Sequence, residues 1–157
     1  MDYFMEHAVV RRKHGVFDAA FILANVLMVL FGIVAIFDMS VILTNFSVAG
    51  LIETVVVTAI AVGLFFYRDR LRVEYDYTFT NGILDFAVIY NGVKRKELGS
   101  LKVKNVEAFG KVDSDSFRRY VSMPGVKTTN WFLNRDAELY YFYFQKGGNR
   151  RIIVLEP

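Results

Sequence analysis

The sequence predicts a membrane α-helical hairpin followed by a small all-β domain with six to seven antiparallel strands and one short helix. The hairpin is predicted by two long apolar segments, residues 19–37 with no charged side chain and residues 48–67 with one. The β domain is predicted by a hydrophobic period of two that begins after Tyr67, and by two Asn-Gly pairs ten residues apart. The predicted parts are an N-terminal cytoplasmic segment (1–15), the hairpin (16–67) and a cytoplasmic β domain (68–157).

Composition and charge narrow the classes of function. Hydrophobic residues make up 54% of the 157 residues, above the roughly 45–50% of soluble domains. Cysteine is absent, which excludes disulfides, thiolate metal sites and a cysteine nucleophile. The predicted β domain carries a net charge of +5, from 16 basic and 11 acidic residues. For a membrane-anchored domain this charge favours anionic lipid headgroups over nucleic acid, and we expect no nucleic-acid partner.

The flanking charges predict the orientation of the hairpin. The first apolar segment spans about 28 Å at roughly 1.5 Å per residue, close to the thickness of a bilayer core. The loop predicted at residues 38–47 holds no Lys or Arg. Both termini are therefore expected in the cytoplasm. The basic residues on which this rests are Arg11, Arg12 and Lys13 before the hairpin, and Arg68, Arg70 and Arg72 after it.

Glu53 is the one charged residue of the second apolar segment. An intramembrane carboxylate is a candidate proton site, helix-pairing group or partner contact. The alternative is that Glu53, five residues inside the segment, extends its side chain toward the outer surface or is neutral there. We favour this second interpretation.

The first Asn-Gly pair predicts the register of a β-hairpin. A two-residue type I′ turn at Asn81-Gly82 places Phe79 opposite Leu84 and Tyr77 opposite Phe86. All pairs on that face are apolar, so we expect the aromatic side chains to lie in the core.

The second pair, Asn91-Gly92, leaves two registers open. A two-residue loop places Phe86 opposite Glu97, and a three-residue loop places it opposite Leu98. In either case a basic triplet begins the third strand.

The rest of the chain predicts further strands and one helix. Residues 113–116 provide N-capping side chains for a short helix. Extended structure is expected through about residue 112 and, beyond the helix, at residues 127–133, 137–145 and 150–155.

The pattern of these features resembles a known family. A basic cluster ending in Lys13, a helical hairpin, the aromatic strand at residues 75–82, the triplet at 94–96 and the segment 106–110 are similar to an uncharacterised family of small membrane proteins from Gram-positive bacteria. The soluble part of that family resembles bacterial pleckstrin-homology-like (PH-like) domains. The resemblance implies a PH-like barrel or sandwich in the bacterial cytoplasmic membrane, and it supplies no catalytic residues.

One feature departs from that family pattern. PH-like barrels usually close one end with a C-terminal helix, whereas residues 152–157 read as a strand. Residues 1–10 are one candidate to cover the open end, as a helix with Met1, Met5 and Ala8 near one face. The same segment could lie in the membrane interface. Alternatively, a partner protein or a second copy of the chain covers the open end of the barrel.

No group of residues predicts catalysis or metal binding. His7 and His14 precede the hairpin and would need distant ligands to hold a metal. Asp113 and Asp115 lack the other ligands of a calcium loop and fit helix capping better. We expect no enzyme activity, no metal and no cofactor.

The sequence therefore favours a membrane-anchored, non-enzymatic binding or adaptor module at the cytoplasmic face. It would recognise a membrane or cytoplasmic protein partner or anionic lipid headgroups, and a second copy is a possible partner. The alternative is a small accessory subunit of a membrane transporter or envelope complex that acts through its hairpin and Glu53. The candidate binding residues, which equally serve as a solvated strand edge, are Lys94, Arg95, Lys96, Lys102, Lys104, Arg118 and Arg119.

Overall fold

The computed structural model describes residues 3–12 and 15–157. The chain forms two compact units, a helical unit (Lys13–Arg72) and a β unit made of Met1–Arg12 together with Val73–Pro157. The N-terminal segment, predicted to be separate, thus groups with the β domain. The interpretations that involved Met1, Lys13 and His14 lie outside the described residues.

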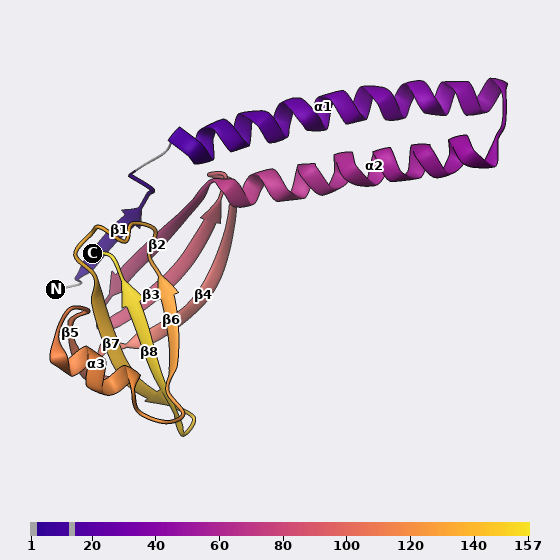
Figure 1. Ribbon diagram of the computed structural model, residues 1–157. Helices are drawn as coiled ribbons and strands as arrows, with labels where there is room; N and C mark the ends of the chain where they lie inside the picture. The colour runs from indigo at the N-terminus through magenta and orange to yellow at the C-terminus, as the bar shows by residue number, and fades with distance from the viewer. Residues whose placement is uncertain (1–2, 13–14) are drawn as a thin grey trace. The chain divides into compact units, whose positions relative to one another are not determined.

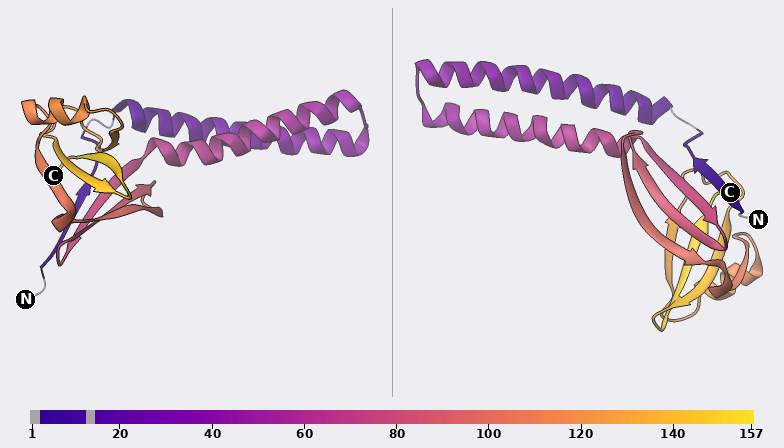
Figure 2. Two further views of the ribbon diagram at one scale, coloured as in Figure 1. Left: turned by 90° about the horizontal axis from the view of Figure 1, so that it is seen from below. Right: turned by 180° about the vertical axis from the view of Figure 1, so that it is seen from behind.

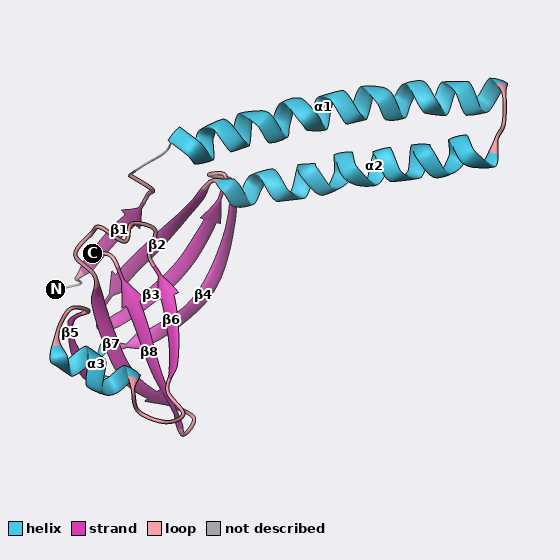
Figure 3. Ribbon diagram, viewed as in Figure 1, coloured by secondary structure: helices cyan, strands magenta, loops and turns pink. Residues whose placement is uncertain are grey.

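Two antiparallel helices make up the helical unit (Figures 1 and 3). Helix α1 is Gly15–Thr44 and α2 is Val48–Arg68, followed by the short 3₁₀ helix η1, Asp69–Leu71. Both long helices are long and apolar enough to cross a membrane. The predicted loop at residues 38–47 was too long, because residues 39–44 contain no Gly or Pro and continue the helix. Ser47 then caps α2 by accepting a hydrogen bond from the Gly50 N–H at 2.9 Å.

Polar contacts fix how the two helices align. The Arg68 guanidinium donates to Asn25 Oδ1 at 2.6 Å, and Arg72 pairs with Asp18 at 3.1 Å. Because Arg68 ends α2, the part of α1 that runs beside α2 begins near Asn25.

The first sheet of the β unit has the order β1-β2-β3-β4. The predicted first hairpin is confirmed, with Tyr77 opposite Phe86 and Phe79 opposite Leu84. Asn81 and Gly82 have φ of 48° and 84°, the two positive values that a type I′ turn requires. The strands are β1 (Phe4–Val9), β2 (Val73–Thr80), β3 (Ile83–Tyr90) and β4 (Lys94–Lys102).

The second hairpin has a three-residue loop, with Tyr90 opposite Lys94. Neither predicted partner of Phe86 is observed, because a β-bulge places Gly99 opposite it. Gly99 has φ of 148°, a backbone conformation that residues other than glycine rarely adopt. The bulge thus depends on Gly99, and the alternation of apolar residues gives no sign that this glycine changes the register.

The N-terminal segment forms a strand rather than the helix considered from the sequence. Strand β1 pairs antiparallel with β2, with Met5 opposite Phe79 and Val9 opposite Tyr75 (Figure 2). Residues two apart, such as Met5, His7 and Val9, share a face of a strand. Val9 is buried there.

The second sheet has the order β5-β7-β8-β6, in which β6 and β8 are parallel and the other pairs antiparallel. The described residues thus hold eight strands in two four-stranded sheets, an open sandwich and not a closed barrel. The predicted short helix is confirmed as α3 (Asp115–Val121), capped by Ser114. The strands are β5 (Val106–Lys111), β6 (Lys127–Trp131), β7 (Tyr140–Lys146) and β8 (Asn149–Leu155), and a 3₁₀ turn η2 (Val103–Asn105) precedes β5.

Two apolar clusters hold the β unit together. The first lies between the sheets, where Phe86 packs against Trp131 with ring centroids 4.6 Å apart. The second lies between the second sheet and α3, where Tyr120 stacks on Tyr143 at 4.4 Å. One face of the second sheet is therefore covered by α3, and its other face packs on the first sheet.

Candidate functional site

The sandwich has two open sides, each between the edge strands of the two sheets (Figure 1). Strands β1 and β5 border one side, and β4 and β6 border the other. A cavity opens on each side, and the two cavities differ in size and chemistry.

The larger cavity, here called the β1–β5 groove, has a volume of about 680 Å³. This is within the range of roughly 300–1,000 Å³ typical of ligand sites. Met5 of β1 and Phe109 of β5 remain 69% and 72% exposed at its rim. Large apolar side chains grouped around a concave surface mark interaction sites more often than isolated ones do. The groove is lined by Met5, Glu6, His7, Tyr77, Phe79, Leu84, Phe109, Tyr140, Phe142, Leu155 and Pro157.

Tyr77 is a buried residue of the groove lining. Its ring stacks on His7 with centroids 6.3 Å apart, and its hydroxyl donates to the Trp131 carbonyl. The Glu156 N–H donates to the same hydroxyl oxygen at 3.5 Å. Burial raises the pKa of Tyr77 well above its usual value of about 10, so the side chain is a neutral phenol. Part of the groove wall is therefore a hydrogen-bonded, uncharged aromatic side chain.

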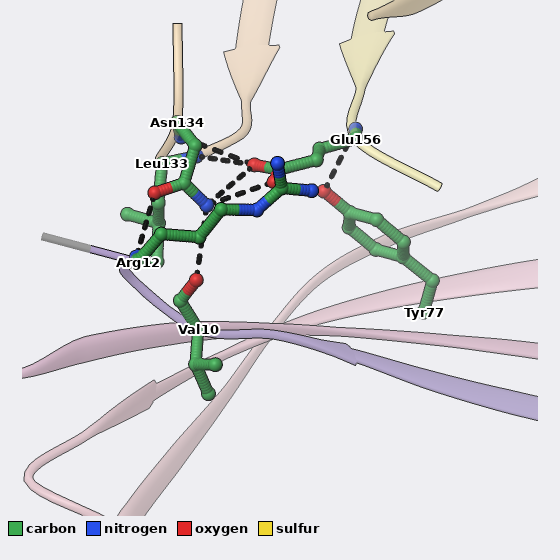
Figure 4. A network of polar contacts seen from close by, with 6 residues as sticks. All are labelled: Val10, Arg12, Tyr77, Leu133, Asn134 and Glu156. Carbon is green, nitrogen blue, oxygen red and sulfur yellow. Dashed lines mark hydrogen bonds and ion pairs between the residues drawn. The ribbon is translucent and has the colours of Figure 1, made fainter. Parts of the chain in front are cut away.

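A buried polar network holds the segment after β1 in place (Figure 4). The Glu156 carboxylate accepts hydrogen bonds from the backbone and side-chain amides of Asn134, and Arg12 lies 3.6 Å away. Asn134 also accepts from the Arg12 N–H at 2.8 Å and donates to the Val10 carbonyl at 3.0 Å. Because β1 forms one wall of the groove, the network that holds Val10 and Arg12 also holds this wall in place. From the sequence, Arg12 was assigned only to membrane orientation, and no local pattern pointed to Asn134 or Glu156.

The seven predicted basic residues do not form one surface. Lys94 and Lys96 begin the nine-residue strand β4, and Lys102 ends it, about 25 Å away at roughly 3.3 Å per residue. Arg118 and Arg119 lie on α3, which covers the second sheet. Lys104, in η2, follows the far end of β4. The predicted patch thus separates into three groups.

Arg95 is engaged within the first sheet. Its guanidinium lies 2.8 Å from a carboxylate oxygen of Asp76, which is only 3% exposed. An ion pair with a buried carboxylate is costly to break, because it would leave a charge unpaired in a desolvated position. Arg95 therefore has a structural role.

The helical unit holds two carboxylates within its apolar length. Glu53 is exposed on α2, whereas the neighbouring Thr54 is buried against α1. Asp38 lies in α1, where the sequence predicted a loop, and one of its oxygens is buried without a hydrogen-bond partner. Asp38 is thus a second candidate carboxylate in the helical unit, which the misplaced loop concealed.

The remaining polar candidates take no part in a metal site among the described residues. No group of three or more His, Cys, Asp or Glu side chains that could hold a metal is found there. His7 lines the groove, and Ser114, between Asp113 and Asp115, caps α3 by accepting from the Phe117 N–H at 3.3 Å.

Comparison with family models decides the classification of this sandwich. The model described as bacterial PH-like domain (DUF6106) matches residues 1–157. The chain is a member of this bacterial PH-like family. The match includes the helical unit, so the family is defined by the hairpin and the PH-like sandwich together. No curated protein and no solved structure matches the chain.

Proposed function

We propose that this PH-like protein is a membrane-anchored, non-enzymatic binding module that holds an apolar segment of a partner protein in the β1–β5 groove. The observation that carries the proposal is the groove itself, a concave apolar surface of about 680 Å³ with Met5 and Phe109 exposed at its rim.

The strands beside the groove favour a polypeptide over a small molecule. Strands β1 and β5 end their sheets, so each has one edge without a neighbouring strand among the described residues. Such an edge offers backbone N–H and C=O groups to an added extended segment. Side chains of that segment on one face would then enter the groove, because alternate residues of a strand share a face.

The helical unit supports anchoring of this module in a membrane. Both helices pass the length and hydropathy requirement for a span, and their surfaces are largely exposed in the hairpin. Arg68 at the end of α2 and the basic residues before α1 follow the positive-inside pattern. We therefore propose a location in the bacterial cytoplasmic membrane with the sandwich and both termini in the cytoplasm.

Site-directed photo-crosslinking tests the groove. A photoreactive phenylalanine analogue is placed at Phe109 or Met5 in the full chain, and at Val93 as a control. Val93 is 81% exposed in the β3–β4 turn and lies outside the groove lining. We expect a discrete crosslinked product in the native membrane from the two groove positions and none from Val93.

The same crosslinking experiment can refute the groove as the partner site. Absence of a product at both groove positions, or an equal product at Val93, would exclude the groove as the partner site. A Phe109→Ser variant that retains the Met5 crosslink at full yield would show that the apolar rim does not contribute to binding.

A second candidate function rests on the helices. Glu53 is exposed on an otherwise apolar stretch of α2, which favours an accessory subunit that pairs with other membrane helices. In that case Glu53→Gln reduces co-purification of a membrane partner in mild detergent while the groove crosslinks persist. Unchanged co-purification by Glu53→Gln would count against this candidate.

A further inference from the structure

The second open side of the sandwich holds a small cavity of different character. It lies between β4 of the first sheet and β6 and β8 of the second, and its volume is about 90 Å³. That volume corresponds to roughly three water molecules in the liquid, so it accommodates a small ion and excludes a peptide. Its walls are Phe86, Leu98, Gly99, Ser100, Thr129, Trp131, Phe144, Lys146, Arg151 and Ile153. We refer to it as the β4–β6 pocket.

The charged side chains of the β4–β6 pocket are both cationic. Arg151 of β8 and Lys146 of β7 line it, and none of the lining residues is acidic. Neither cation has an ion-pair partner within the part of the chain that the structure describes. The Nε of Arg151 is buried and lacks a hydrogen-bond partner. A buried guanidinium donor without an acceptor costs free energy, which binding of an anion would recover.

The sheet register adds a third positive charge beside the pocket. Lys127 of β6 lies directly across from Arg151 of β8. Like charges on adjacent strands destabilise a sheet when nothing compensates them. Three clustered cations at the end of a sheet therefore favour a ligand with more than one negative charge.

The remaining lining groups fit an oxyanion. Thr129 supplies a hydroxyl, and the Gly99 bulge leaves backbone open to the pocket, because a Cβ built there would meet no atom within 4 Å. Arginine presents its N–H groups in a planar fork that matches two oxygens of a phosphate. Lysine acts beside it as a point charge.

We propose that the β4–β6 pocket binds a phosphate group, held by Arg151 with Lys146 and Lys127 as supporting charges. The phosphate belongs either to a soluble phosphate compound or to a lipid headgroup that ends in a phosphate monoester, since both present the same terminal phosphate oxygens. This site is separate from the β1–β5 groove and shares none of its lining residues. None of its three cations was among the basic residues singled out in the sequence.

Trp131 provides a direct readout, because it is the single tryptophan of the chain and lines the pocket. The full-length protein in a neutral detergent is titrated with inorganic phosphate while its tryptophan emission is recorded, with sodium chloride at equal ionic strength as the control. We expect a saturable change with phosphate and not with chloride. Arg151→Gln should weaken the apparent affinity about tenfold to 100-fold, as for loss of a hydrogen-bonded charge.

Two further variants separate the site from general charge and from misfolding. Arg150→Gln removes the same charge from the adjacent, exposed position of β8, outside the pocket lining, and should leave the phosphate response unchanged. Lys146→Gln alters an exposed side chain, so it should weaken binding without loss of fold even if Arg151→Gln lowers stability. Far-ultraviolet circular dichroism of each variant checks the fold.

A second set of titrations identifies the source of the phosphate. The protein is placed in bilayer discs of phosphatidylcholine alone or with phosphatidic acid. A Trp131 change that depends on phosphatidic acid and on Arg151 indicates a lipid headgroup, whereas a response to added inorganic phosphate in phosphatidylcholine discs indicates a soluble ligand. The proposal is overturned if neither source changes the emission, or if Arg150→Gln and Arg151→Gln weaken the response equally.

Discussion

Replacement of Asn134 by alanine tests whether the buried network holds the N-terminal strand. The change removes the acceptor of the Arg12 N–H, the donor to the Val10 carbonyl and the donor to the Glu156 carboxylate. Asn134 is 5% exposed and Glu156 3% exposed, so water cannot readily replace these bonds. The loss therefore includes the cost of leaving buried groups unpaired.

The expected magnitude follows from the three bonds. Each of the two bonds to the backbone contributes about 1 kcal/mol, and the bond to the charged carboxylate contributes about 1.5–3 kcal/mol. We expect the unfolding free energy of the β unit to fall by roughly 3.5–5 kcal/mol, a large share of the roughly 5–15 kcal/mol typical of a domain.

Urea unfolding of the full chain in neutral detergent, followed by Trp131 fluorescence, measures this change. Asn130→Ala is the matched control, because Asn130 is an exposed asparagine in β6. Hydrogen exchange of the β1 amides gives an independent readout, and we expect faster exchange in Asn134→Ala. A loss below about 1 kcal/mol, or one equal to that of Asn130→Ala, would refute the assigned role of the network.

Three further predictions concern the groove wall, the first turn and the orientation. Tyr77→Phe should lower the free energy of unfolding at neutral pH, and its difference from the wild type should narrow above about pH 10. Burial raises the folded-state pKa of Tyr77, so the wild type alone loses stability when this phenol ionises in the unfolded chain. Denaturant unfolding between neutral and alkaline pH measures the difference. Gly82→Ala should destabilise the β unit by roughly 1–2 kcal/mol in the same assay, because Gly82 has φ of 84°. The chain has no cysteine, so Phe46→Cys and Ser116→Cys each give a single thiol. In intact cells a membrane-impermeant maleimide should label the cysteine at position 46 and not the one at position 116. The reverse labelling would overturn the proposed topology.

Local chemistry explains why parts of the fold followed from the sequence. The Asn81-Gly82 turn and the alternation of apolar residues around it specify the same pairing of Tyr77 with Phe86, and this register was observed. The helices were found from unbroken apolar length, yet α1 continued through Asp38 because a single charge does not end a helix when the residues that follow it, 39–44, contain no Gly or Pro.

The candidate sites could not be located in the same way. The β1–β5 groove and the β4–β6 pocket lie between strands that are distant in the chain, and their walls exist only because β1 pairs with β2 and because β6 pairs in parallel with β8. The predicted basic residues were chosen by closeness in sequence, whereas Lys127, Lys146 and Arg151 meet through the sheet.

The sequence by itself determined the two apolar helices, the first β-hairpin and the short capped helix, because each depends on side chains within a few residues of one another. The tertiary structure alone decided how the open sandwich is covered. The N-terminal residues join the first sheet as a strand, and the Asn134–Glu156 network fixes them there. The hydrogen bonds that join Asn134 to Val10 and Arg12 connect residues more than 100 positions apart, and no local pattern of the chain encodes such a pairing.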